Sequence, residues 1–146
     1  MKSEKLKKIS IGIIRQNNQF VLQRRPQEAR IGAAGLIGCF GGQIKLDTDT
    51  NEPLETAQEA VAREVAEETT LTTLPAEWVE LGFVEVDSDR DLKPIRIHAT
   101  VFENRLAEDE EIYATEGTLV RMSKRELLAS PDQISPATIE AFRKYI

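Results

Sequence analysis

The chain has 146 residues, of which 40% are hydrophobic, and its formal net charge is −6. This acidity argues against a nucleic-acid polymer as the main partner, because phosphate backbones are bound by basic surfaces. No apolar stretch approaches the about 18 residues of a membrane span, and no cleavage site of small residues follows the basic N-terminus. We therefore expect a single domain over residues 1–146, cytoplasmic and without a membrane partner.

The first elements are predicted to be two strands joined by a turn. Apolar residues alternate along 9–14, the polar run 16–19 follows, and a second apolar segment lies at 20–22, which together indicate a β-hairpin. Five glycines between residues 30 and 42 then indicate a loop whose backbone approaches another group closely. The acidic segment 46–52 is predicted to be a solvated surface loop.

A central helix is predicted over 57–69, because Thr56 and Glu59 have the spacing of a capping box, in which each side chain bonds a backbone N–H at the helix start. Further strands are expected at 78–86, 94–102 and 118–122. A closing helix should begin at Ser135-Pro136 and bury Ile139, Phe142 and Ile146. This order of elements predicts a mixed α/β domain in which helices cover a sheet.

The central helix carries Glu64, Glu67 and Glu68 at positions i, i+3 and i+4, so their carboxylates share one patch of its surface. Such a patch is often only a solvated acidic face. Here Glu64 and Glu68 continue the arc of the apolar Val61, at about 100° per residue, and should turn toward the protein. Buried carboxylates are costly unless paired or bound to metal, and Arg63 is available as a partner.

Carboxylate oxygens that converge without a cysteine and histidine set suit a hard cation such as Mg²⁺ or Mn²⁺ better than zinc. Mg²⁺ lowers the pKa of a bound water and neutralises charge on a leaving phosphate, and a nearby carboxylate accepts the proton of that water. The residues alone therefore indicate metal-assisted hydrolysis, with phosphate esters as one candidate substrate class.

Glu55, followed after seven residues by Arg63-Glu64-Val65-Ala66-Glu67-Glu68-Thr69-Thr70-Leu71, closely resembles the Nudix box, G-x5-E-x7-R-E-U-x-E-E-x-G-U, where U is aliphatic. The glycine pair Gly41-Gly42 precedes it, and the order of strands is similar over most of the chain. The resemblance implies a Nudix-like α/β/α sandwich with a mixed β-sheet. It also implies a hydrolase that cleaves a diphosphate linkage in a small nucleotide, with Mg²⁺ or, in its place, Mn²⁺.

Three features depart from the family pattern. Twelve residues separate Gly42 from Glu55, seven more than in the pattern, and they fall in the acidic loop, where extra length costs little entropy. Thr70 replaces the box glycine and is expected to shorten or reshape the helix end, since glycine is favoured there for its left-handed conformation. Phe40 replaces the proline that often precedes the glycine pair. None of these changes removes an acid.

The resemblance also implies roles for the residues of the box. Glu67 and Glu68 correspond to metal ligands, Glu64 to a ligand or the general base, Arg63 to the residue that orients the acids, and the Gly41 carbonyl to a further ligand.

Further site residues are expected outside the box. A last acidic ligand usually comes from a later loop, where Glu116 is our candidate and Glu110 and Glu111 are its competitors. Arg24 and Arg25, at the end of the second strand, are expected to hold a substrate phosphate or base, although such pairs are also ordinary surface residues.

Two other residues with reactive side chains are expected to be structural. His98 is the only histidine, and on an alternating strand it favours a packing role, with a cleft-lining role as the alternative. Cys39 should be buried and unreactive, since no adjacent histidine activates it, and a lone cysteine fits a reducing compartment.

The leading hypothesis is a (deoxy)nucleoside triphosphate pyrophosphohydrolase. Relatives that act on ADP-ribose or on dinucleoside polyphosphates usually carry a proline or a tyrosine downstream of the box, and Val86-Asp87-Ser88 contains neither, although ADP-ribose and other nucleotide sugars stay open. A non-catalytic nucleotide-sensing module is a second alternative, against which the complete acidic core argues. An isomerase of prenyl diphosphates would need a catalytic cysteine and other acids. The sequence leaves open whether the chain forms a homodimer.

Overall fold

A computed structural model describes residues 5–26, 35–88 and 95–146. Its centre is a seven-stranded mixed sheet in which β1 (Lys5–Gln16) runs parallel to β6 (Ile95–Arg105) from Lys5 to Arg15. β5 (Val79–Ser88) pairs antiparallel with the outer side of β6. The other side of β1 is shared, because β4 (Phe40–Gln43) pairs with residues 9–12 of β1 and β2 (Gln19–Arg24) pairs with residues 14–16.

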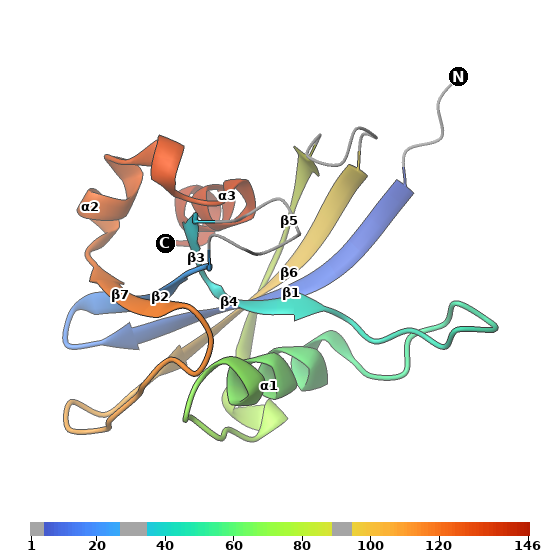
Figure 1. Ribbon diagram of the computed structural model, residues 1–146, viewed down its shortest axis with the longest axis horizontal. Helices are drawn as coiled ribbons and strands as arrows, with labels where there is room; N and C mark the ends of the chain where they lie inside the picture. The colour runs from blue at the N-terminus through green and yellow to red at the C-terminus, as the bar shows by residue number, and fades with distance from the viewer. Residues whose placement is uncertain (1–4, 27–34, 89–94) are drawn as a thin grey trace.

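Two short strands and three helices complete the fold (Figure 1). β3 (Ile37–Gly38) and β7 (Thr118–Met122) both pair antiparallel with β2. The helices are α1 (Ala57–Glu68), α2 (Lys124–Leu128) and α3 (Pro136–Tyr145), and single 3-10 turns lie at Pro75–Glu77 and Pro131–Gln133. In the described part of the chain, no helix is long and apolar enough to cross a membrane.

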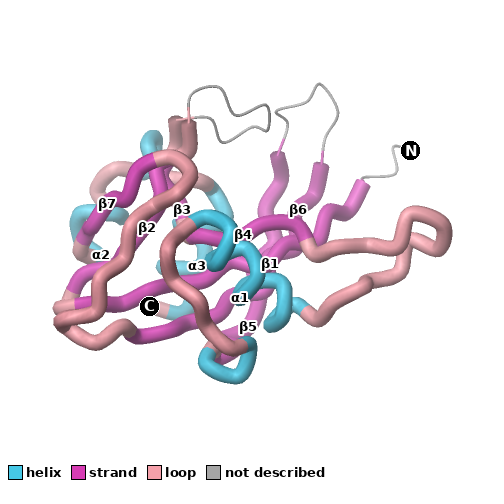
Figure 2. Tube along the Cα trace, turned by 60° about the horizontal axis from the view of Figure 1, so that its bottom comes forward, coloured by secondary structure: helices cyan, strands magenta, loops and turns pink. Residues whose placement is uncertain are grey.

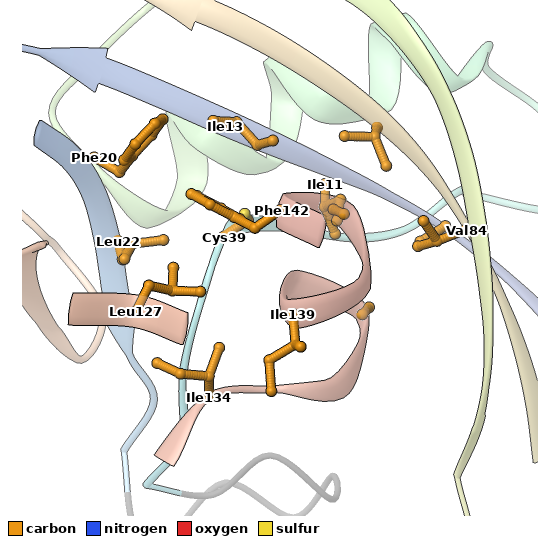
Figure 3. Close-up of a cluster of buried hydrophobic side chains, with 14 of the residues drawn as sticks. Ile11, Ile13, Phe20, Leu22, Cys39, Val84, Leu127, Ile134, Ile139 and Phe142 are labelled. Atoms are coloured by element: carbon orange, nitrogen blue, oxygen red, sulfur yellow. The ribbon is translucent and has the colours of Figure 1, made fainter. Parts of the chain in front are cut away.

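The sheet buries a separate apolar core on each face. Ile13 and Ile14 are adjacent in sequence, and since strand side chains alternate, Ile13 packs in the core beneath α3 and Ile14 in the core beneath α1. The core beneath α3 is drawn in Figure 3, and Figure 2 shows the strands lying between the helices. Each fully buried aliphatic or aromatic side chain contributes about 1.5–3 kcal/mol, so both layers stabilise the sheet. The expected α/β/α sandwich with a mixed sheet is confirmed.

The capping box that predicted α1 is formed. The Thr56 hydroxyl accepts the N–H of Glu59 at 3.0 Å, and the Thr56 N–H donates to Glu59 Oε1 at 2.9 Å. At its other end the helix stops at Glu68, one residue earlier than predicted, and the chain leaves through Thr69 in an extended conformation with φ −139° and ψ 175°. The exit from the helix therefore does not use a left-handed residue, which explains how Thr70 replaces the box glycine.

The prediction of a loop over residues 30–42 is wrong for its described part, because β3 and β4 lie there. Residues 30–34 lie outside the described part of the chain. β4 forms because its backbone pairs with β1, a long-range contact that a glycine-rich sequence does not reveal. The short helix α2 was also not predicted, although Ser123 and Glu126 form a capping box at its start.

The other elements agree with prediction. Asn17 and Asn18, both with positive φ, make the hairpin turn, and strand β7 has the expected bounds. The segment 46–52 is a largely exposed turn closed by a bridge between Leu46 and Pro53. In α3, Ile139 and Phe142 are buried and Ile146 packs partly against the same core.

Candidate functional site

A cavity of about 340 Å³ runs along β1. Asp87 of β5, which pairs with Arg96, lines it, and so do three further acids, namely Glu64 and Glu68 from α1 and Glu116 from the segment before β7. Gly41 also lines it and pairs in the sheet with Ile11, which places the acids near this point of β1. Lys7, two positions before Ile9 on β1, also lines the cavity, beside apolar residues of neighbouring strands. The apolar lining consists of Ile9, Ile11, Leu36, Val86, Ile95, Ile97, Pro136 and Ala137.

Glu68 is the most deeply buried of these acids, with 7% of its surface exposed. Burial raises the pKa of its carboxyl to about 7, although the Gly41 N–H donates to Oε1 at 2.9 Å and lowers it. The negative charges of Glu64 and Glu116 raise this pKa further, and Arg25 lowers it. The three acids therefore lie within electrostatic reach of one another, and a cation among them would remove the cost of charging Glu68.

The glycine pair allows β4 to pack directly against the acids. A Cβ on Gly42 would lie 2.6 Å from Cδ of Glu64, and a Cβ on Gly41 would clash with the backbone carbonyl of Ser10. Gly41 also has φ +146°, which side chains rarely adopt. Both glycines are thus required by close approach, and the carboxylate of Glu64 lies against the strand.

Arg63 ties the acids of the box together, as expected of an orienting residue. Its guanidinium donates to Glu55 at 2.6 Å, to Glu64 at 2.9 Å and to Glu67 at 3.3 Å, and to the Gln43 carbonyl at 3.1 Å. The hydrogen bond from Arg63 holds the pKa of Glu55 below its usual value, and the same bond raises the pKa of Arg63. Arg63 therefore restrains the carboxylate of Glu64, which also lies against Gly42.

Besides Arg63, two of the expected site residues stand apart from the cavity. The side chain of Glu67 is 55% exposed and bonds Arg63, and Glu67 is not among the residues that line the cavity. Arg24 donates through Nη1 to the Gly35 carbonyl at 3.1 Å, whereas Arg25 lines the cavity. Of the arginine pair, Arg25 is thus the one that lines the cavity.

The competitors of Glu116 lie elsewhere. Glu110 and Glu111 line a separate hollow with Gln16 and Arg121, and the Glu110 carbonyl accepts a hydrogen bond from the Gln16 amide at 2.6 Å. Glu116 is the candidate acid that shares a cavity with Glu64 and Glu68.

His98 and Cys39 are placed as structural residues. The His98 ring stacks on Phe83 with centroids 4.6 Å apart, and its Nδ1 lies 3.0 Å from Glu85. Cys39 lies among core side chains near Phe142, as Figure 3 shows, and burial raises the pKa of its thiol to about 12. The thiol therefore stays protonated and unreactive at neutral pH.

Several polar residues that line the cavity were missed by sequence reasoning, and Gln23 and Lys7 are two of them. Gln23 is buried on β2 and donates through Nε2 to the Glu116 carbonyl at 2.8 Å. Lys7 belongs to the basic N-terminal stretch of the sequence, yet it shares one face of β1 with Ile9 and Ile11. That two-residue spacing was the available signal for Lys7.

The donor set fits a hard divalent cation. Among residues 5–26, 35–88 and 95–146, no three Asp, Glu, His or Cys side chains form a ready ligand set. The oxygen donors present are carboxylates together with backbone carbonyls, and a cation such as Mg²⁺ commonly completes a site of this kind with water and substrate phosphate. Burial and the charges of Glu64 and Glu116 raise the pKa of the Glu68 carboxyl, so a cation among these acids would stabilise its charged form.

Comparisons with known proteins give a match to one family and to several solved structures. A family model described as a NUDIX domain matches residues 6–145. No curated protein matches the chain in sequence.

Several solved structures are similar in fold. A MutT protein from Methanosarcina mazei has a TM-score of 0.76 and 21% identity, covering 99% of this chain and 96% of that chain. A MutT NUDIX hydrolase from Burkholderia pseudomallei has a TM-score of 0.75 and 20% identity, covering 98% and 100%. An Ap4A hydrolase from C. elegans has a TM-score of 0.62 and 14% identity, covering 96% of each chain. At such identities the likeness establishes the fold, and substrate has to be argued from the site.

Proposed function

This chain belongs to the Nudix family of hydrolases, and on that premise we propose that it is a metal-dependent pyrophosphohydrolase of (deoxy)nucleoside triphosphates. The observation that carries the proposal is the cavity in which Glu64, Glu68 and Glu116 gather beside an apolar stretch of β1, β5 and β6.

The layout of the cavity suits a nucleotide. Gly41 pairs with Ile11 near the acids, whereas Ile97 pairs with both Lys7 and Val86 four residues earlier along β1. At about 3.3 Å per residue, this stretch extends roughly 13 Å, which is enough for a phosphate chain near the acids and a nucleoside against the apolar walls. The cavity volume of about 340 Å³ favours one nucleoside over the two of a dinucleoside polyphosphate.

We propose that Glu64, Glu68, Glu116 and the Gly41 carbonyl hold the metal. A bound Mg²⁺, or Mn²⁺ in its place, supplies an acidified water and neutralises the leaving pyrophosphate. Glu64, which accepts a hydrogen bond from Arg63 and lies against Gly42, serves in this proposal as ligand or as acceptor of the water proton. Arg25 binds substrate phosphate.

Glu67 and Arg24 are not among the residues proposed to contact the metal or the substrate directly. Glu67 reaches the metal only by exchanging its contact with Arg63, since its side chain points to solvent. Arg24 supports the backbone at Gly35 and leaves phosphate binding to its neighbour.

The test is release of pyrophosphate from a panel of nucleoside triphosphates, ADP-ribose, nucleotide sugars and dinucleoside polyphosphates, with Mg²⁺, with Mn²⁺ and with chelator. We expect turnover of a triphosphate to nucleoside monophosphate and pyrophosphate, abolished by chelator and by Glu68→Gln. Metal-dependent turnover of ADP-ribose alone would move the substrate class to nucleotide sugars. Tight binding without turnover across the panel would identify a nucleotide-sensing module instead.

A further inference from the structure

The C-terminal end of α1 is joined to the segment that carries Glu116. Thr69 and Ala114 form an antiparallel bridge, the Thr70 N–H donates to the Tyr113 carbonyl at 2.9 Å, and the Thr115 N–H donates to the Glu68 carbonyl at 2.9 Å. The segment before β7 therefore runs beside the end of the helix, as the orange trace next to α1 shows (Figure 1). It satisfies a helix carbonyl that would otherwise lack a partner.

Two threonine hydroxyls complete this junction. The Thr70 hydroxyl accepts the Tyr113 N–H at 3.0 Å, and the Thr115 hydroxyl donates to the Glu67 carbonyl at 2.8 Å. Thr70 occupies the position at which the Nudix box has glycine, and glycine offers no hydroxyl to this segment. The departure from the family pattern thus adds a specific contact to the segment that ends in Glu116.

The opposite side of Glu116 is held by β2. The Gln23 amide donates to the Glu116 carbonyl at 2.8 Å. Gly117 follows with φ +67°, and a Cβ there would clash with the Arg24 carbonyl, so the chain passes directly against the strand. The backbone at Glu116 is thus held between α1 and β2, while the residue itself is exposed and lines the cavity.

We propose that Thr70 and Thr115 are positioning residues that hold Glu116 beside Glu68 and so determine the metal affinity of the site. The inference rests on the proposed role of Glu116 as a metal ligand. Neither threonine lines the cavity, and both act through the backbone of residues 113–116. Loss of both hydroxyls leaves the segment held to the end of α1 by backbone hydrogen bonds alone, which gives the carboxylate of Glu116 more freedom to move away from Glu68.

The test is Mn²⁺ binding to the substrate-free protein, followed by the electron paramagnetic resonance of free Mn²⁺, with thermal unfolding measured on the same samples. The variants are Thr70→Val with Thr115→Val, which keep shape and lose both hydroxyls, and Thr70→Ser with Thr115→Ser, which keep the hydroxyls. Glu116→Gln is made in the parental and in the double-valine background, and Glu111→Gln and Thr72→Val are the matched controls. Binding is compared at a temperature at which every variant is folded.

We expect the double-valine variant to bind Mn²⁺ about 10-fold more weakly, because loss of a group that positions a metal ligand typically lowers metal affinity by at least this factor. The double-serine variant and both controls should bind Mn²⁺ as the parent does. Glu116→Gln should weaken binding in the parent and add little in the double-valine background, because both changes remove the same interaction.

Two results would overturn the inference, and they are distinguishable. Parental Mn²⁺ affinity in the double-valine variant, together with weakened binding in Glu116→Gln, would refute the positioning role and leave the ligand assignment intact. Parental affinity in Glu116→Gln itself would refute the ligand assignment and with it the inference.

Discussion

The backbone N–H of Gly41 donates to Oε1 of Glu68 over 2.9 Å, so β4 and the end of α1 meet at one buried carboxyl. The N–H favours the charged form of Glu68, but desolvation outweighs it and raises the pKa of this carboxyl to about 7. In the metal-free protein, charging Glu68 therefore lowers the free energy of unfolding, and this loss can be measured.

Glu68→Gln should remove a pH dependence of stability from the metal-free protein. Between the usual pKa of 4.5 and about 7, the folded parent binds more protons than the unfolded chain, so its free energy of unfolding falls as pH rises through this window and levels off above it. We expect the variant to exceed the parent by up to about 3 kcal/mol at pH 8 and to match it near pH 4. Urea unfolding with chelator at both pH values checks this, and parallel pH profiles would contradict it.

Glu55→Gln should change the pH dependence of the free energy of unfolding in the opposite direction. Arg63 lowers the pKa of Glu55 in the folded protein, so this pair stabilises the fold above the ordinary pKa of 4.5 and is lost as pH falls through the lower folded value. The variant should lose about 2 kcal/mol at pH 7 and approach the parent in acid. Urea unfolding of Glu55→Gln is compared with that of Glu52→Gln, an exposed acid nearby. Equal losses at pH 7 and in acid would exclude the charge pairing as the cause.

Alanine at each of the two glycines of β4 should affect a different property, turnover at Gly42 and stability at Gly41. In Gly42→Ala the new Cβ meets the flexible carboxylate of Glu64, so we expect the fold to persist and kcat to fall about 100-fold, the typical cost of misplacing a catalytic group by about 1 Å. In Gly41→Ala the Cβ meets the backbone of Ser10 at φ +146°, so stability should fall by about 1–3 kcal/mol or more. Thermal unfolding and turnover of both variants separate the effects, and a large loss of Tm in Gly42→Ala would count against its assignment.

The adjacent arginines Arg24 and Arg25 should differ in substrate binding. Arg25 lines the cavity, so Arg25→Ala should raise KM for a nucleoside triphosphate about 10-fold or more, as loss of a charged hydrogen bond predicts. Arg24→Ala breaks a bond to the Gly35 carbonyl and should leave KM near the parental value. Steady-state kinetics of both variants provide the comparison. Similar rises in KM would mean that both guanidinium groups reach the substrate.

Local sequence patterns were sufficient for α1 and its acids. The capping box of Thr56 and Glu59 defines the helix start, and the helical period then places Glu64 and Glu68 on the buried side. These features depend on residues within three or four positions of one another, and such contacts follow from backbone geometry alone.

The composition of the cavity was decided by tertiary structure. Gly41 meets Glu68 across 27 positions of the chain, and Gln23 holds Glu116 across 93 positions. The sequence could not show that β4 is a strand, that Lys7 lines the cavity, or that Glu116 and not Glu111 joins the acids. Helical periodicity likewise grouped Glu67 with its neighbours, whereas the contact with Arg63 turns it to solvent. Each outcome depends on which strands pair and how loops close over them, and these long-range free energies are not encoded in any short stretch of residues.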